Sequence, residues 1–160
     1  MGRPGRPDKL FELAQKIAHE DTAFFAPSKG AGKGDRDTNE FMKKLRKQAK
    51  DEFDCDLAEQ KLCRDNGSKA DFYFCEEETI VEVALSLWNS RSEFHLDILK
   101  AILALKNNHP VKKLLFISKQ GAKKQLEAPL SWSIIEWVKE DYTGCPKSPV
   151  RSSWWWGIRG

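Results

Sequence analysis

The chain has 160 residues and a mass of 18.3 kDa, which suits one domain, and its 40% hydrophobic and 11% aromatic content excludes an intrinsically disordered chain. The net charge is +3 and the mean hydropathy is −0.61, and the sequence contains neither an apolar run that could span a bilayer nor a signal-peptide core. The four cysteines lack Cys-x-x-Cys spacing, which argues against a zinc finger or a disulfide scaffold, so we expect a cytoplasmic protein with no membrane partner.

Apolar residues at helical spacing predict two helices in the first third of the chain. The first helix runs from Lys9 to His19, a loop rich in glycine and lysine follows over residues 26–37, and the second helix begins near Asp37 or Thr38. The second helix has an apolar stripe formed by Phe41, Leu45, Ala49 and Phe53. Its basic face is formed by Lys43, Lys44, Arg46, Lys47 and Lys50.

From residue 57 the spacing of apolar residues changes from helical to alternating. This pattern predicts strands over residues 57–63, 70–75 and 79–87, of which the last is the clearest. A short charged turn joins the second and third strands, so they should form an antiparallel hairpin. One face of this hairpin is apolar and carries Ala70, Phe72, Phe74, Val81, Val83 and Leu85. The other face is mixed and carries Asp71, Tyr73, Cys75, Glu82 and Ala84.

The last part of the chain predicts a helix, a strand and a further helix. The first of these helices runs over residues 92–107 with the stripe Phe94, Ile98, Ile102 and Leu105. A buried strand follows over residues 113–118, which implies a parallel crossover, and a last helix runs from residue 130 or 131 to 140. We therefore expect one α/β domain over residues 1–142, with its core at 38–120, a central mixed sheet of four or more strands flanked by helices, and a Trp-rich tail over 143–160.

Charge is unevenly distributed along the chain. Residues 1–50 carry a net charge of +5, residues 51–100 of −8 and residues 101–160 of +6. An acidic centre between basic ends is typical of a metal-dependent enzyme that acts on a polyanion, because carboxylates bind the cation and basic flanks bind the phosphates. Ordinary scatter of charge over solvated faces gives the same totals, so the choice depends on the residues of the centre.

Two carboxylates in this centre are hard to explain by packing. Asp71 lies on the first arm of the predicted hairpin and Glu82 on the second, so antiparallel pairing brings them toward each other. Adjacent carboxylates repel each other unless a cation lies between them. The pair can therefore hold Mg²⁺ (or Mn²⁺) against a phosphate, where the metal would polarise the phosphorus and lower the pKa of a bound water.

The pattern around these residues resembles the PD-(D/E)XK nuclease superfamily, which includes many type II restriction endonucleases. The resemblance covers residues 38–120, with Asp71 in KADFYF, Glu82 in TIVEVALSLWNSRSEFHLDILKAIL, the helix that follows and the strand KKLLFISK. It implies a restriction endonuclease-like fold, a divalent metal bound by Asp71 and Glu82 with help from the Val83 carbonyl, and metal-dependent hydrolysis of double-stranded DNA.

One position departs from the superfamily's pattern in a way that matters for catalysis. Ala84 stands where a lysine usually activates water and stabilises the pentavalent phosphorus. Members of the superfamily relocate this charge, and our first candidate is Lys61, which shares a face with Glu59 on the preceding predicted strand; Lys69 and Lys100 are others. Without such a lysine, the alternative is a catalytically impaired module that binds nucleic acid or a protein partner.

Further residues extend the predicted site. Glu59 is a third candidate metal ligand, and the candidate DNA contacts are Lys43, Lys44, Lys47 and Arg91. A solvated surface is the alternative explanation for Glu59 and the lysines, and the start of the following helix is the alternative for Arg91. A restriction-type enzyme would form a homodimer, because a two-fold symmetric protein can cut both strands of a palindrome. Residues 154–156, all Trp, suit base stacking, a dimer contact or packing on the core, and the sequence does not decide among these.

Overall fold

The computed structural model describes residues 5–21, 33–62, 68–83, 85, 91–119 and 155–158. Within these residues the chain forms three helices and five strands. The helices are α1 (Arg6–Glu20), α2 (Lys33–Phe53) and α3 (Arg91–Lys106), and the strands are β1 (Ala58–Lys61), β2 (Lys69–Phe74), β3 (Thr79–Val83), β4 (Lys113–Lys119) and β5 (Trp155–Ile158). None of the helices described here is long and apolar enough to cross a membrane.

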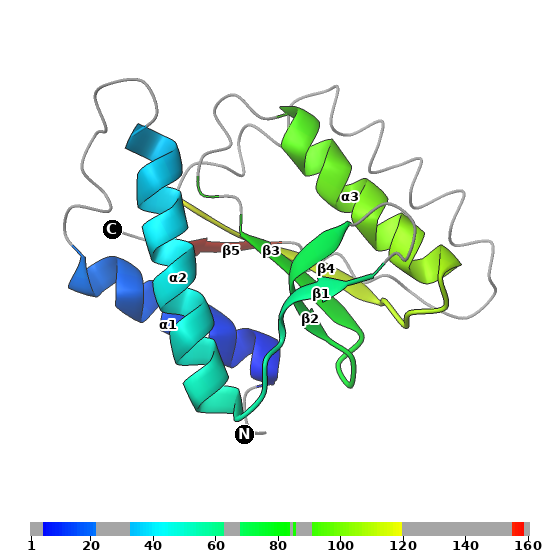
Figure 1. Cartoon of the computed structure of the whole chain (residues 1–160), viewed down its shortest axis with the longest axis horizontal. Helices are drawn as coiled ribbons and strands as arrows, with labels where there is room; N and C mark the ends of the chain where they lie inside the picture. The colour runs from blue at the N-terminus through cyan, green and yellow to red at the C-terminus, as the bar shows by residue number, and fades with distance from the viewer. Residues whose placement is uncertain are drawn as a thin grey trace.

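The strands form one mixed sheet in the spatial order β1-β2-β3-β4-β5 (Figure 1). β1 and β2 pair antiparallel, as do β2 and β3, whereas β3 pairs parallel with β4 and β4 pairs parallel with β5. The first four strands already make a mixed open sheet, which confirms the predicted α/β class. As the sequence predicts, β2 and β3 form an antiparallel hairpin. β3 also pairs parallel with β4, and α3 lies between these two strands along the chain, as predicted.

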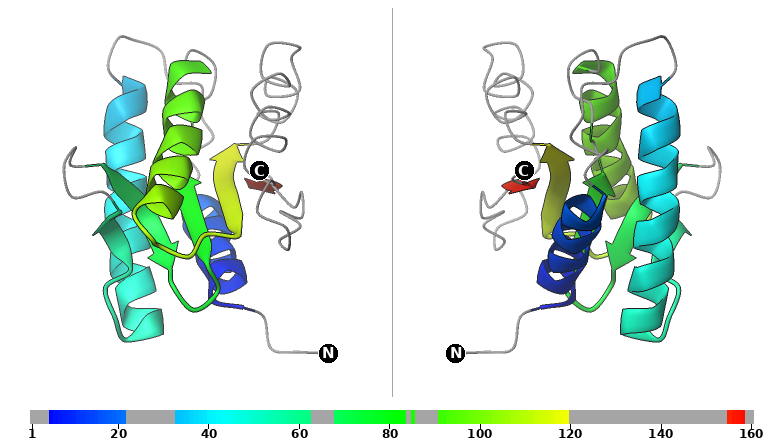
Figure 2. Two further views of the ribbon diagram at one scale, coloured as in Figure 1. Left: turned by 90° about the vertical axis from the view of Figure 1, so that its right-hand side faces the viewer. Right: turned by 90° about the vertical axis from the view of Figure 1, so that its left-hand side faces the viewer.

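Helices cover both faces of this sheet. Figure 1 and Figure 2 show α1 and α2 on one face and α3 on the other. The core under α1 and α2 contains Val81 and Ile117, while their neighbours Ile80 and Phe116 belong to the core under α3. Strands that are covered on both faces need apolar side chains on both, so the mixed face of the predicted hairpin is itself largely buried. Tyr73, for example, lies in the core under α3.

Two boundaries differ clearly from those predicted. α2 begins at Lys33, so residues 33–37 are helical and do not belong to the preceding loop. Gly34, Asp35 and Asp37 favour a loop in the sequence pattern, but acidic residues are also common in the first turns of helices. β3 spans Thr79–Val83, and Leu85, inside the strand predicted over residues 79–87, is not in a strand, while residues 84, 86 and 87 lie outside the described part.

The buried face of α3 also differs in part from the predicted stripe. Ile98 and Ile102 are buried as predicted, but Leu105 is 41% exposed, and Ala101 and Ala104 pack in the core instead. α3 has apolar residues on almost every side, so the sequence pattern alone does not define which face meets the sheet.

The Trp-rich segment lies partly within the described residues. Trp155–Ile158 form β5, with Trp155 opposite Phe116 and Gly157 opposite Ser118 of β4. Part of the segment that the sequence sets apart as a tail therefore pairs with the central sheet. The helix predicted over residues 130–140 lies outside the described residues, as does Trp154.

Candidate active site

Asp71 and Glu82 lie side by side on β2 and β3. Phe72 pairs with Val81 in the antiparallel register, which places Asp71 next to Glu82. The Asp71 backbone N–H donates to Glu82 Oε2 at 3.3 Å, and the Val83 backbone N–H donates to Asp71 Oδ2 at 2.9 Å. Each carboxylate is thus fixed by the backbone of the other strand. Asp71 and Glu82 therefore lie next to each other, as the predicted hairpin requires.

Glu82 is buried in a way that is costly for a carboxylate. Its side chain is 1% exposed, and no hydrogen bond to Oε1 exists among the described residues. Burial first, and then the nearby charges of Asp71 and Asp97, raise the pKa of Glu82 to about 9. In the free protein this group is therefore protonated at neutral pH. A divalent cation would offset both causes, so the residues present fit a bound metal.

A lysine from α3 lies close to Glu82. Lys100 Nζ lies 3.5 Å from Glu82 Oε1 and 2.7 Å from Asp97 Oδ1, one turn earlier on the same helix. Burial of the Lys100 ammonium acts to lower its pKa, but the hydrogen bond to Asp97 and the surrounding acidic groups outweigh burial and raise the pKa above its usual value. Lys100 is therefore a cation beside Asp71 and Glu82.

A second cation approaches from α2 on the outer side of Asp71. Arg46 donates from Nη1 to Glu59 Oε1 at 2.5 Å, and its Nη2 lies 3.8 Å from Asp71 Oδ1. Glu59 also accepts from Lys69 Nζ at 3.3 Å. The hydrogen bond from Lys69 and the charge of Arg46 lower the pKa of Glu59, so this carboxylate is ionised and already has cationic partners.

The backbone at Glu59 is in a left-handed conformation, with φ of 49°. Such a conformation is uncommon for a residue with a side chain and costs of order 1–3 kcal/mol. It occurs inside β1, in the short stretch between Ala58 and Gln60 that pairs with β2. Local strain therefore lies directly beside Asp71, and strained residues are frequent near functional sites.

Of the other predicted site residues, Lys61 lies at the end of β1, opposite Lys69, and is exposed. The structure contains no ion pair between Lys61 and Asp71 or Glu82. Ala84 lies outside the described residues. Arg91 begins α3, and its side chain lies outside the described part. Among the candidate lysines, Lys100 therefore lies beside Glu82, although the sequence offers it only as a later alternative to Lys61.

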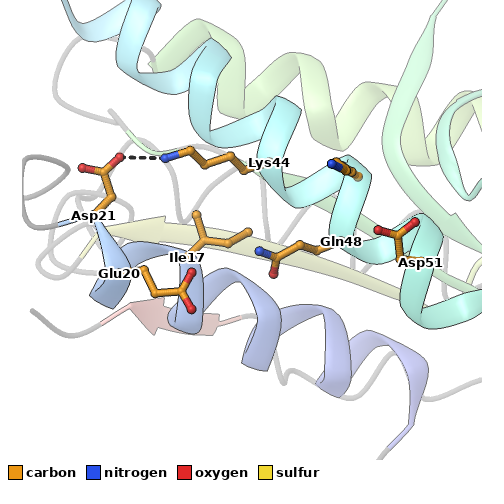
Figure 3. A pocket seen from close by; sticks show the side chains of 7 residues that line it. Ile17, Glu20, Asp21, Lys44, Gln48 and Asp51 are labelled. Atoms are coloured by element: carbon orange, nitrogen blue, oxygen red, sulfur yellow. Dashed lines mark hydrogen bonds and ion pairs between the residues drawn. The ribbon is translucent and has the colours of Figure 1, made fainter.

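The three lysines of α2 that the sequence predicts as DNA contacts are exposed, on the side away from the core. Lys44 donates to Asp21 Oδ2 at 3.0 Å, which ties α2 to the end of α1. Lys44 and Lys47 border a hollow of about 530 Å³ between these two helices, together with Glu20, Asp21 and Asp51, among others (Figure 3). Carboxylates thus stand beside part of the basic face, which weakens its attraction for a polyanion.

Two residues of the site do not emerge from the sequence pattern. Asp97 is not among the predicted residues, and Arg46 is assigned only to a basic helix face. A signal for Asp97 exists: Asp97 and Lys100 are three apart within the mostly apolar stretch from Leu96 to Leu105, a spacing at which opposite charges meet. No comparable local signal marks Arg46, because its contact with Asp71 depends on how α2 lies against the sheet.

The described residues contain no group of three or more His, Cys, Asp or Glu side chains arranged to hold a metal ion. A cation would therefore rely on Asp71 and Glu82 and complete its shell with backbone, water and substrate oxygens, as Mg²⁺ commonly does. Comparison with known proteins gives no further guidance: no family model, curated protein or solved structure matches this chain.

Proposed function

We propose that this protein is a metal-dependent DNA endonuclease of the restriction type, with the restriction endonuclease-like fold, that hydrolyses phosphodiester bonds. The observation that carries the proposal is Glu82, a carboxylate buried beside Asp71 with one oxygen that lacks a hydrogen bond and with Lys100 3.5 Å away. Burial of such a group is unfavourable for the fold alone. A cation and a phosphate at this position would use all three side chains.

Asp71 and Glu82 would hold Mg²⁺ or Mn²⁺, and the bound cation would polarise the scissile phosphate and lower the pKa of an attacking water. Lys100 adds a fixed positive charge where negative charge develops on the phosphate oxygens. Asp97 acts as a positioning residue, because its ion pair at 2.7 Å holds the Lys100 side chain in place. Arg46 does the same for Asp71 from the opposite side.

A DNA substrate also needs contacts to its backbone, and cleavage of both strands favours a homodimer. The lysines of α2 are one candidate surface for these contacts, and Lys61 and Lys69 at the edge of the sheet are another. Both surfaces are exposed, so neither requires rearrangement to meet a duplex.

A catalytically impaired module that binds nucleic acid or a protein partner is the second candidate. One observation favours it: Lys100 already pairs with Glu82 and Asp97, so the pocket holds a compensating charge without any metal. Such a module would bind DNA equally well in the presence and absence of divalent cations, whereas the nuclease requires them for cleavage.

Plasmid cleavage tests the proposal. The full chain is incubated with supercoiled DNA and Mg²⁺ or Mn²⁺, with EDTA in a parallel reaction. We expect metal-dependent nicking or cutting that falls by at least about 10³-fold in Asp71→Asn and in Glu82→Gln, because each substitution removes a charged metal ligand at constant size. Glu12→Gln, an exposed carboxylate of α1, is the matched control and should retain activity. Folded wild-type protein that cuts with neither metal would refute the nuclease.

A further inference from the structure

Lys61 and Lys69 form an unfavourable pair at the edge of the sheet. They lie directly opposite each other in the antiparallel register of β1 and β2, and both are exposed. Residues in this relationship point to the same face with their Cβ atoms close together, so two ammonium groups repel each other and weaken the strand pairing. Nothing in the local packing calls for lysine at either position.

The compensation for these two charges is incomplete. Lys69 pairs with Glu59 at 3.3 Å, but Glu59 also carries the ion pair with Arg46. Within the described residues Lys61 makes no ion pair. Two cations therefore share the exposed carboxylate of Glu59 while Lys61 has no anionic partner within the described residues, and the excess of positive charge faces solvent, where an anion can reach it.

The position of this pair relative to the candidate active site is informative. Lys69 and Asp71 are two residues apart on β2, so they lie on the same face about 7 Å from each other along the strand. Successive phosphates along one strand of DNA are separated by a similar distance. A DNA strand with its scissile phosphate at Asp71 and Glu82 would thus bring the adjacent phosphate to the two lysines.

We propose that Lys61 and Lys69 bind the backbone phosphate adjacent to the scissile phosphate of double-stranded DNA. The inference rests on the proposed function for the position of the scissile phosphate. It assigns Lys61 to substrate binding, in place of the catalytic role that its sequence position suggests. It also makes the edge formed by β1 and β2 the principal phosphate contact, ahead of the lysines of α2. Glu59 then holds Lys69 and Arg46 in place while the DNA is absent.

Binding to a short DNA duplex tests this assignment with two variants of equal charge. Lys61→Gln/Lys69→Gln removes the proposed contact, and Lys43→Gln/Lys47→Gln removes two exposed lysines of α2. Binding is measured with Ca²⁺ in place of Mg²⁺ over a series of salt concentrations. We expect the first variant to bind about tenfold more weakly, with a salt dependence lower by about one unit of slope for each lost contact, and the second to change much less. Lys61→Arg/Lys69→Arg should restore binding.

Thermal unfolding checks that the variants remain folded, and removal of the repelling pair should leave the stability unchanged or slightly increased. Equal losses in the two double variants, or a larger loss in the α2 variant, would overturn the assignment and leave the nuclease proposal intact. Wild-type protein that does not bind the duplex would also overturn it. Absence of cleavage in every metal, with weaker binding only in the first double variant, would refute the nuclease, and the two lysines would then contact a DNA phosphate that is not next to a scissile one.

Discussion

Glu82 and Glu59 are both predicted metal ligands, yet they lie in opposite surroundings. Glu82 is 1% exposed, and its pKa is raised by burial and by neighbouring carboxylates. Glu59 is exposed, and its pKa is lowered by Lys69 and Arg46. The first group stays protonated at neutral pH although Lys100 lies 3.5 Å away, whereas the second is anionic and paired in the free protein. Under the proposed function, the metal would bind at the buried carboxylate and a phosphate at the exposed edge.

The largest expected effect concerns Lys100, the lysine that we propose to lie beside the scissile phosphate. Lys100→Met should lower the cleavage rate constant kcat by about 10²–10⁴-fold, because it removes the fixed charge beside the scissile phosphate. Lys61→Met should act mainly on KM, since Lys61 lies at the edge of the sheet. Single-turnover cleavage at saturating DNA separates the two effects.

Lys106→Met, an exposed lysine in the last turn of the same helix, is the control for Lys100→Met. Thermal unfolding must accompany the kinetics, because loss of Lys100 leaves Asp97 and Glu82 without their cation. A variant that is folded and retains full kcat, together with a loss of kcat in Lys61→Met, would return the catalytic role to Lys61.

The difference between local and distant contacts explains which features the sequence predicts. The hairpin of β2 and β3 follows from alternation and a short turn, so the pairing of Asp71 with Glu82 is predictable once the hairpin is. Lys100 approaches Glu82 and Arg46 approaches Asp71, from two helices on opposite faces of the sheet. Their approach depends on where those helices pack, which no spacing within either helix specifies.

The same reasoning applies to the fold. The apolar stripe of α2 identifies its buried face, because the opposite face is strongly charged. α3 has no such contrast, so Leu105 is exposed although its spacing suits the core. The mixed face of the hairpin becomes a second core only because α3 covers it, and the length of the crossover alone does not reveal which side chains it covers.

The next effect is a pH dependence of stability that originates from Glu82. Its pKa is raised to about 9, so between its ordinary value near 4.5 and pH 9 the folded protein holds a proton that the unfolded chain has released. The free energy of unfolding in EDTA should therefore fall as pH rises through this window. For a chain of this size, a loss of about 2 kcal/mol lowers Tm by about 4–8 °C.

Glu82→Gln removes this titration and should flatten the dependence, while Glu12→Gln should leave it unchanged. Mg²⁺ should also flatten it in the wild type, because a cation stabilises the ionised carboxylate beside Asp71, Asp97 and Lys100. Identical slopes for wild type and Glu82→Gln between pH 5 and 9 would show that Glu82 is not the buried acid described above.

The smallest effect concerns Glu59 and tests the exposed side of the comparison. Glu59→Gln should change the affinity for Mg²⁺ by less than about fivefold, because an exposed carboxylate with two cationic partners contributes little to a neighbouring site. DNA should bind slightly more tightly, since a negative charge beside the proposed phosphate contact is lost and Lys69 is released. Titration calorimetry with Mg²⁺ and duplex binding measure the two quantities, with Asp71→Asn as the reference for a lost metal ligand. A fall in Mg²⁺ affinity comparable to that of Asp71→Asn, without tighter DNA binding, would make Glu59 a metal ligand and join the two regions into one site.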